Sequence, residues 1–161
     1  MPGAGHSRNG RRADRGAGVD HQEVGLVDGV AAVLDTAPLV FALGNQPDLV
    51  GRGARRFLQR AATRGSKIAV SAVSLFEVAQ LEERGRLWLG LPFDHWCQLV
   101  EDTPPLLLVP LERSHVSEAR ALPTLREPFD RLIAGTAIAL GVPLISSDER
   151  IARSGRLRVV W

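Results

Sequence analysis

The segment Val30-Ala31-Ala32-Val33-Leu34-Asp35-Thr36 is a run of apolar residues that ends at a carboxylate and a hydroxyl. A run of this kind is typical of a strand buried on both faces, as in a parallel sheet. In open α/β sheets, ligands bind beyond the carboxyl ends of the strands. The segment therefore predicts a buried strand that places Asp35 at the ligand-binding rim of a sheet.

A second segment near the other end of the chain repeats this design. The run Val142-Pro143-Leu144-Ile145-Ser146-Ser147 is apolar, passes through hydroxyls and ends at Asp148. Asp148 could equally be the N-cap of a short helix at 149–153. The hydroxyls beside the two acids, Thr36 and Ser146, are candidate groups for holding the carboxylates in place.

The segment around Glu77 predicts a helix that leaves a short strand at 68–70. Ser74 and Glu77 fit a capping box, with serine at the N-cap and glutamate three residues later, which is an ordinary structural role. The first turn of such a helix also lies at the carboxyl end of the strand. Glu77 is therefore expected on the same rim as Asp35.

Residues 127–141 predict a helix that is apolar nearly all round and therefore buried. Pro128 suits its first turn, and Gly141 suits its end. Asp130 could interact with the helix dipole. However, after Glu127 at the start of this range, Asp130 and Arg131 are the only charges in an otherwise apolar helix, and a charge there costs free energy unless something pairs with it. A metal ion would provide that partner.

Strands and helices alternate from residue 30 to the end, which indicates an α/β fold with a mainly parallel sheet. The chain has 161 residues, 45% of them hydrophobic, and no apolar run of transmembrane length, so we expect one globular domain and no membrane segment.

Residues 1–28 are rich in glycine and arginine and show no periodicity. We predict a disordered tail there, or a start codon assigned too far upstream, and a domain at 29–161.

The composition permits an RNA partner without establishing one. The formal net charge is only +2, and Lys67 is the sole lysine among 20 basic residues. Arginine suits bidentate contacts to phosphate, but a GC-rich genome produces the same bias, and we give that explanation equal weight. A single cysteine, Cys97, excludes an internal disulfide and favours a cytoplasmic location.

Four acidic motifs, taken together and in this order, resemble the PIN-domain ribonucleases, specifically the VapC-type toxins of type II toxin–antitoxin systems. The resemblance covers about residues 30–161. One departure is Glu127, where these toxins usually carry aspartate; we assign that residue a peripheral role. The motifs are Leu34-Asp35-Thr36, Ser71-Ala72-Val73-Ser74-Leu75-Phe76-Glu77-Val78, Pro128-Phe129-Asp130-Arg131-Leu132-Ile133-Ala134 and Ser146-Ser147-Asp148-Glu149-Arg150-Ile151.

The resemblance implies a PIN-like α/β/α sandwich and a Mg²⁺- or Mn²⁺-dependent endoribonuclease. It also implies a homodimer that a cognate antitoxin protein inhibits. Four clustered carboxylates repel one another and favour hard divalent cations, which prefer oxygen ligands. We expect Asp35 and Asp130 to be the main metal ligands, with Glu77 and Asp148 binding directly or through water.

Two arginines adjoin these acids, and their roles stay open at the level of sequence. Arg131 and Arg150 could contact the phosphate of the substrate or form salt bridges with the carboxylates.

Other functions of an aspartate at a strand end fit less well. A haloacid-dehalogenase nucleophile needs a second aspartate two residues later, where this chain has Ala37. A response-regulator receiver domain needs a lysine late in the chain, whereas Lys67 is early. A catalytically inactive PIN-fold module that binds RNA or a protein partner remains the alternative.

Overall fold

The computed structural model describes residues 28–44 and 46–161, so nearly all of the predicted tail at 1–28 lies outside the described residues. The described chain contains one parallel sheet with the strand order β3-β2-β1-β4-β5. This confirms the predicted fold class. The strands are β1 (Val30–Leu34), β2 (Lys67–Ser71), β3 (Leu106–Val109), β4 (Leu144–Ile145) and β5 (Val159–Val160).

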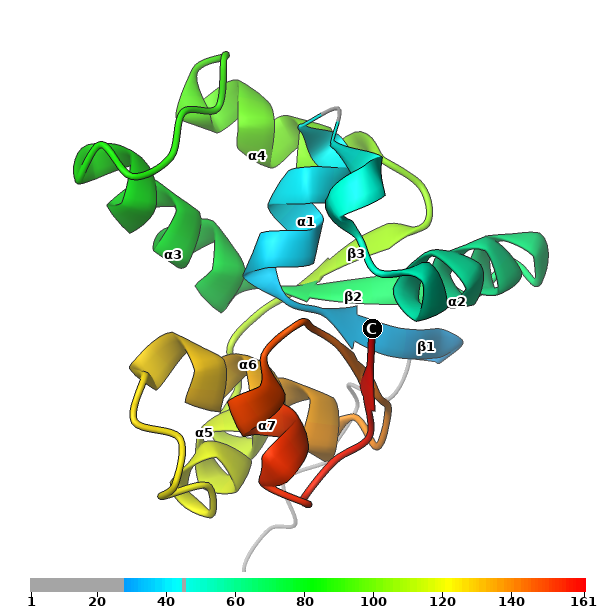
Figure 1. The fold of residues 1–161 in the computed structure, drawn as a ribbon, viewed down its shortest axis with the longest axis vertical. Helices are drawn as coiled ribbons and strands as arrows, with labels where there is room; N and C mark the ends of the chain where they lie inside the picture. Colours follow the sequence, from blue (N-terminus) through cyan, green and yellow to red (C-terminus); the bar gives the residue numbers. More distant parts are fainter. Residues whose placement is uncertain (1–27, 45) are drawn as a thin grey trace, which may run out of the picture.

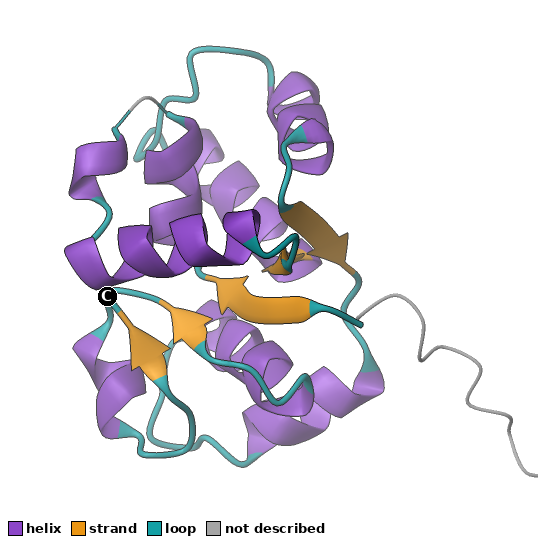
Figure 2. Ribbon diagram, turned by 90° about the vertical axis from the view of Figure 1, so that its right-hand side faces the viewer, coloured by secondary structure: helices purple, strands orange, loops and turns teal. Residues whose placement is uncertain are grey.

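Helices cover both faces of the sheet and make the predicted α/β/α sandwich (Figures 1 and 2). No helix in the described part of the chain is long and apolar enough to cross a membrane. The helical elements are α1 (Thr36–Leu43), the 3₁₀ turn η1 (Pro47–Leu49), α2 (Arg52–Thr63), α3 (Ala72–Glu83), α4 (Phe93–Asp102), α5 (Arg113–Arg120), α6 (Pro128–Ala139) and α7 (Glu149–Arg153).

Strand β1 lies at the centre of the sheet because its side chains are apolar on both faces. Ala32 and Leu34 belong to the core that includes residues of α1, α2 and α4. Val33 points the other way, into the core that includes residues of α5 and α6. All three side chains are at most 1% exposed. The opening segment is therefore buried on both faces, as its composition predicts.

The start of α3 differs from the predicted capping box. The helix begins at Ala72, and its N-cap is Ser71, whose Oγ accepts a hydrogen bond from the Val73 amide at 3.3 Å. Strand β2 runs directly into the helix without a loop, so the hydroxyl at the strand end takes the cap. Ser74 is consequently inside the helix, and Glu77 lies in the second turn instead of the first.

The Ser74 hydroxyl is buried and is unpaired among the described residues. Replacing Ser74 with alanine is expected to raise the free energy of unfolding by about 1 kcal/mol, because an unsatisfied buried hydroxyl costs stability. Urea denaturation measures the change. Ser71→Ala is the matched control and should lower stability by roughly 1 kcal/mol, since it removes the helix cap. Destabilisation by Ser74→Ala would mean that the hydroxyl does have a partner.

Candidate functional site

The predicted acids gather at the rim formed by the carboxyl ends of β1 and β4 and the starts of neighbouring helices (Figure 1). Asp35 follows β1 and is the N-cap of α1. Asp148 follows β4 and is the N-cap of α7. Asp130 lies in the first turn of α6, and Glu77 lies on α3. Parallel strands and the helices that leave them bring these segments together from distant parts of the chain.

Asp35 is the most deeply buried of the four acids, with 7% of its surface exposed. Its Oδ1 accepts a hydrogen bond from the Thr36 amide at 2.8 Å, and its Oδ2 accepts one from the Ser146 hydroxyl at 2.5 Å. Burial raises the pKa of Asp35, while these two hydrogen bonds oppose the rise. Because Ser146 also accepts from the Asp148 amide, one hydroxyl positions two of the acids.

A second hydroxyl positions Glu77. Thr36 is the first residue of α1, and its Oγ1 donates to Glu77 Oε2 at 2.5 Å. This contact holds α1 against α3. Burial raises the pKa of Glu77, and the negative charge of Asp35 adds to the effect. Thr36 and Ser146 therefore each donate a hydrogen bond to one of the acids.

The pKa of the Asp130 carboxyl is strongly raised. Burial, followed by repulsion from Asp35, Glu127 and Asp148, raises its pKa to about 7. The guanidinium of Arg150 counteracts this rise, because its Nη2 lies 3.1 Å from Asp130 Oδ2. Near neutral pH, Asp130 therefore needs a second cation close by to become fully ionised.

Arg150 forms salt bridges instead of standing free for a phosphate. Its Nη2 contacts Asp148 Oδ2 at 2.5 Å as well as Asp130, and this pairing holds the pKa of Asp148 below its usual value. The side chain of Arg150 remains 65% exposed, while those of Asp130 and Asp148 are 15% and 19% exposed. Arg150 thus covers the two carboxylates from the solvent side.

Arg131 makes no salt bridge among the described residues and instead contacts the backbone of α5. Its Nε and Nη2 donate to the Ala119 carbonyl of α5 at 3.2 and 3.1 Å. Successive residues of a helix point about 100° apart, so Asp130 and Arg131 leave α6 in different directions. Arg131 therefore joins α6 to α5 and does not share the contacts of the acidic cluster.

Glu127 has a larger part in the site than the sequence suggested. It is the N-cap of α6, and its Oε2 accepts from the Asp130 amide at 2.8 Å. Its negative charge raises the pKa values of Asp35, Glu77 and Asp130. The sequence feature that could have indicated this role is the position of Glu127 directly before Pro128, because a proline in the first helical position places the preceding residue at the N-cap.

The four carboxylates suit a hard divalent cation, although in this structure they do not converge on a single point. Among the described residues, no three acidic, histidine or cysteine side chains converge closely enough to bind an ion as they stand. Hydroxyls and Arg150 link the carboxylates in a chain instead. The side chains of Asp35, Glu77, Asp130 and Asp148 offer oxygen atoms as metal ligands, and three of these acids have pKa values raised by burial and mutual repulsion. A cation with oxygen preference, such as Mg²⁺ or Mn²⁺, would relieve that repulsion.

Comparisons with known proteins identify the family. The family model of the PIN domain matches residues 32–157. Ribonuclease VapC22 of Mycobacterium tuberculosis (strain ATCC 25618 / H37Rv) is 38% identical over 100 residues, which are 59% of this chain and 75% of the relative. The fold is shared with a chain in the crystal structure of VapBC2 from Rickettsia felis bound to a fragment of promoter DNA. The two chains superpose with a TM-score of 0.61 and are 19% identical; the match covers 81% of this chain and 97% of the Rickettsia felis chain. The chain therefore belongs to the PIN domain family and is a VapC-type member of it, as its acidic motifs predict.

Proposed function

We propose that the protein is a divalent-metal-dependent endoribonuclease and the toxin of a toxin–antitoxin pair. The observation that carries this proposal is Asp130, a carboxylate whose pKa is raised to about 7 by burial and by three other acids at the sheet rim. Perturbed acids that meet at the carboxyl ends of parallel strands are typical of functional sites. Similarity to a relative named a ribonuclease supports the choice of RNA as substrate.

The residues present suit Mg²⁺ or Mn²⁺, which when bound lowers the pKa of a water molecule and stabilises negative charge on a phosphate. Asp35 and Asp130 would hold the ion, and Glu77 and Asp148 would complete the site directly or through water. Thr36 and Ser146 keep their neighbouring carboxylates in fixed orientations, so little reorganisation is needed when substrate arrives.

Arg150 has a role in this scheme that follows from its salt bridges. Asp130 and Asp148, which would help to hold the ion, are the carboxylates that Arg150 contacts, so Arg150 would have to give up these contacts for the carboxylates to bind a cation. The side chain is long and largely exposed, so it can turn outward. There it would contact the phosphate of RNA, for which its planar group is well suited.

We further propose that the protein forms a homodimer, binds a cognate antitoxin and acts in the cytoplasm. Phe76 on α3 is 58% exposed, and Trp88 and Leu91 in the following segment are 87% and 37% exposed. Exposed apolar side chains of this size suit contact with an apolar segment of a protein partner. The lone cysteine is compatible with a reducing compartment.

Cleavage of RNA by the purified protein tests the proposal. Fragments should form with Mg²⁺ or Mn²⁺, disappear with a chelator, and be reduced at least 10²-fold by Asp130→Ala, an order of magnitude typical for loss of one essential charged group. Asp94→Ala is the matched control, because Asp94 is also in the first turn of a helix but is exposed. Cleavage by Asp130→Ala at the parent rate would contradict the four-acid site. A parent that neither cleaves RNA nor binds metal would be the inactive binding module.

A further inference from the structure

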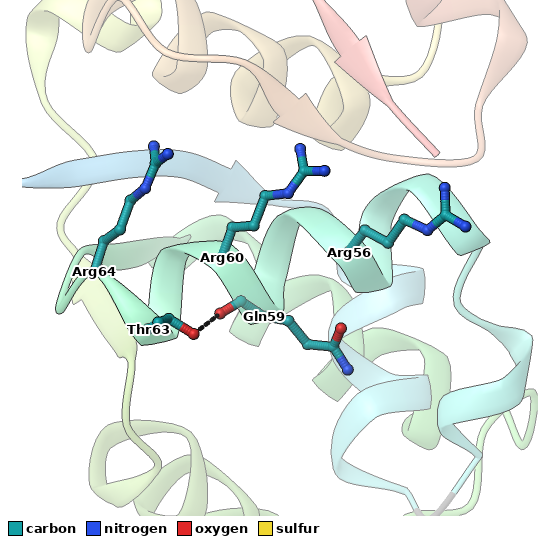
Figure 3. A pocket seen from close by; sticks show the side chains of 5 residues that line it. All are labelled: Arg56, Gln59, Arg60, Thr63 and Arg64. Carbon is teal, nitrogen blue, oxygen red and sulfur yellow. Dashed lines mark hydrogen bonds between the residues drawn. The ribbon is translucent and has the colours of Figure 1, made fainter.

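Helix α2 carries three arginines along one exposed face, and the set of Arg56, Arg60 and Arg64 is called here the α2 arginine row. The three residues are spaced one helical turn apart, with Arg64 at the C-cap. Figure 3 shows their side chains extending in the same direction from successive turns. Together with Gln59 and Thr63 they line a shallow hollow of about 230 Å³.

Neither packing nor helix stability accounts for this row. Within residues 28–44 and 46–161, no salt bridge joins the row to a carboxylate, whereas the neighbouring Arg55 pairs with Asp48 at 2.9 Å. Helix α2 itself contains no acidic residue. Like charges one turn apart repel each other and destabilise a helix. An anion outside the chain would turn this repulsion into attraction.

The spacing of the row suits the backbone of a nucleic acid. Side chains one turn apart on a helix are separated by about 5–6 Å at Cβ, which is close to the separation of successive phosphates along a strand. Guanidinium groups bind phosphate oxygens in a bidentate manner. The amide of Gln59 and the hydroxyl of Thr63 beside the row can hydrogen-bond to ribose hydroxyls.

The row begins on the side of the molecule that carries the acids. A Cβ added to Gly51, the N-cap of α2, would lie 2.7 Å from the carbonyl carbon of Trp161. Trp161 directly follows β5, which pairs in parallel with β4, and β4 leads to Ser146. The start of α2 is therefore at the carboxyl ends of the strands. The row extends from there toward their amino ends.

We propose that the α2 arginine row binds the sugar-phosphate backbone of an RNA strand outside the cleavage site. It lengthens the RNA footprint without reading the base sequence, since contacts to phosphate carry no sequence information. The choice of RNA as the polyanion rests on the proposed function. The regular spacing of the positive charges favours a regular phosphate backbone over an acidic protein.

Salt-dependent RNA binding tests this proposal. The affinity for a labelled single-stranded RNA is measured by fluorescence anisotropy in the presence of a chelator. Every protein tested is the full chain and carries the substitution Asp130→Ala, which prevents cleavage of the RNA. The row variant is Arg56→Gln/Arg60→Gln/Arg64→Gln. The control variant changes the same number of exposed arginines elsewhere, Arg84→Gln/Arg113→Gln/Arg120→Gln. Glutamine has nearly the helix propensity of arginine, so both variants should fold.

The row variant should weaken RNA binding on the order of 100-fold at 0.1 M salt and reduce the slope of log K against log salt by about 2, because each phosphate contact in a single strand contributes about 0.7. The control should leave the slope unchanged. Equal affinities and slopes for the two variants would overturn the proposal even if the parent protein cleaves RNA. Loss of binding confined to the row variant would support it even if no cleavage occurs.

Competition distinguishes RNA from other polyanions. Unlabelled RNA should displace the labelled strand more effectively than single-stranded DNA of the same sequence or polyglutamate of the same charge. If single-stranded DNA or polyglutamate displaced the labelled strand as effectively as RNA does, the assignment of the row to RNA would be contradicted.

Discussion

Replacing Asp130 with asparagine is expected to stabilise the metal-free protein at pH 8 and to abolish RNA cleavage. The pKa of Asp130 is about 7 in the folded chain, against 3.8 for an unperturbed aspartate. Between pH 3.8 and about pH 7, Asp130 is therefore protonated in the folded state and ionised in the unfolded state. Stability therefore falls as pH rises through this window, and the full cost is present above pH 7. Asparagine has the same shape and no charge, so it removes that cost.

The expected gain is roughly 2–4 kcal/mol at pH 8, because each unit of pKa shift corresponds to about 1.4 kcal/mol. Urea denaturation in chelator at pH 5 and pH 8 measures it, and the difference between variant and parent should grow with pH. Asp94→Asn, an exposed acid in the first turn of α4, should show no such growth. Equal stability of variant and parent at pH 8 would mean that Asp130 is not under electrostatic strain.

Saturating Mg²⁺ should reverse the order of stability. A ligand that binds only the folded state stabilises it by mass action, and the parent binds the ion more tightly because it keeps the Asp130 carboxylate. The parent should then be the more stable protein. The Asp130 carboxylate would thus lower the stability of the metal-free protein and raise the stability of the metal-bound protein. This behaviour is expected of a residue that binds a metal ion and not of a core residue.

Replacing Gly135 with valine is expected to lower the free energy of unfolding by about 3 kcal/mol or more. Gly135 is in the middle of α6, where α5 crosses it closely. A Cβ there would lie 2.5 Å from the His115 carbonyl oxygen and 2.8 Å from the Ala119 nitrogen. Both are backbone atoms of a helix, so they cannot move aside as a flexible side chain would. The two helices would have to separate.

The matched control is Ala139→Val, an exposed position on the same helix, which should cost only about 0.5 kcal/mol of helix propensity. Chemical denaturation compares the two variants. Because α6 also carries Asp130, Gly135→Val should reduce metal affinity in the fraction that still folds. Stability equal to that of the control would show that α5 and α6 can separate at little cost.

The strands and the acids were predictable because each depends on a local pattern. Segment 30–34 is apolar on both faces, and β1 is the central strand of the sheet. By contrast, residues 47–63 form two helical elements, η1 and α2, which are separated near Gly51. A Cβ at Gly51 would meet Trp161, which is more than 100 residues away in the chain. No local pattern can predict a boundary that is set by a contact of this kind.

The internal arrangement of the site was less predictable than its members. The capping-box pattern predicts Ser74 as the N-cap of α3, but β2 passes directly into the helix, and Ser71 at the end of the strand is the cap. Likewise, both Arg131 and Arg150 adjoin acids in sequence, but helix geometry directs one to α5 and the other to the carboxylates. Such choices depend on which direction a side chain points in the folded chain.

The sheet order has a consequence for the time at which the activity first arises during synthesis. Strand β4 is made late, yet it pairs with β1 at the centre of the sheet and supplies Ser146 to Asp35. A nascent chain that has emerged only as far as α6 lacks this strand, and it lacks Asp148. The rim can be assembled only after residues up to Asp148 have left the ribosome. A ribosome is thus not exposed to the activity of a nascent chain that has emerged only as far as α6.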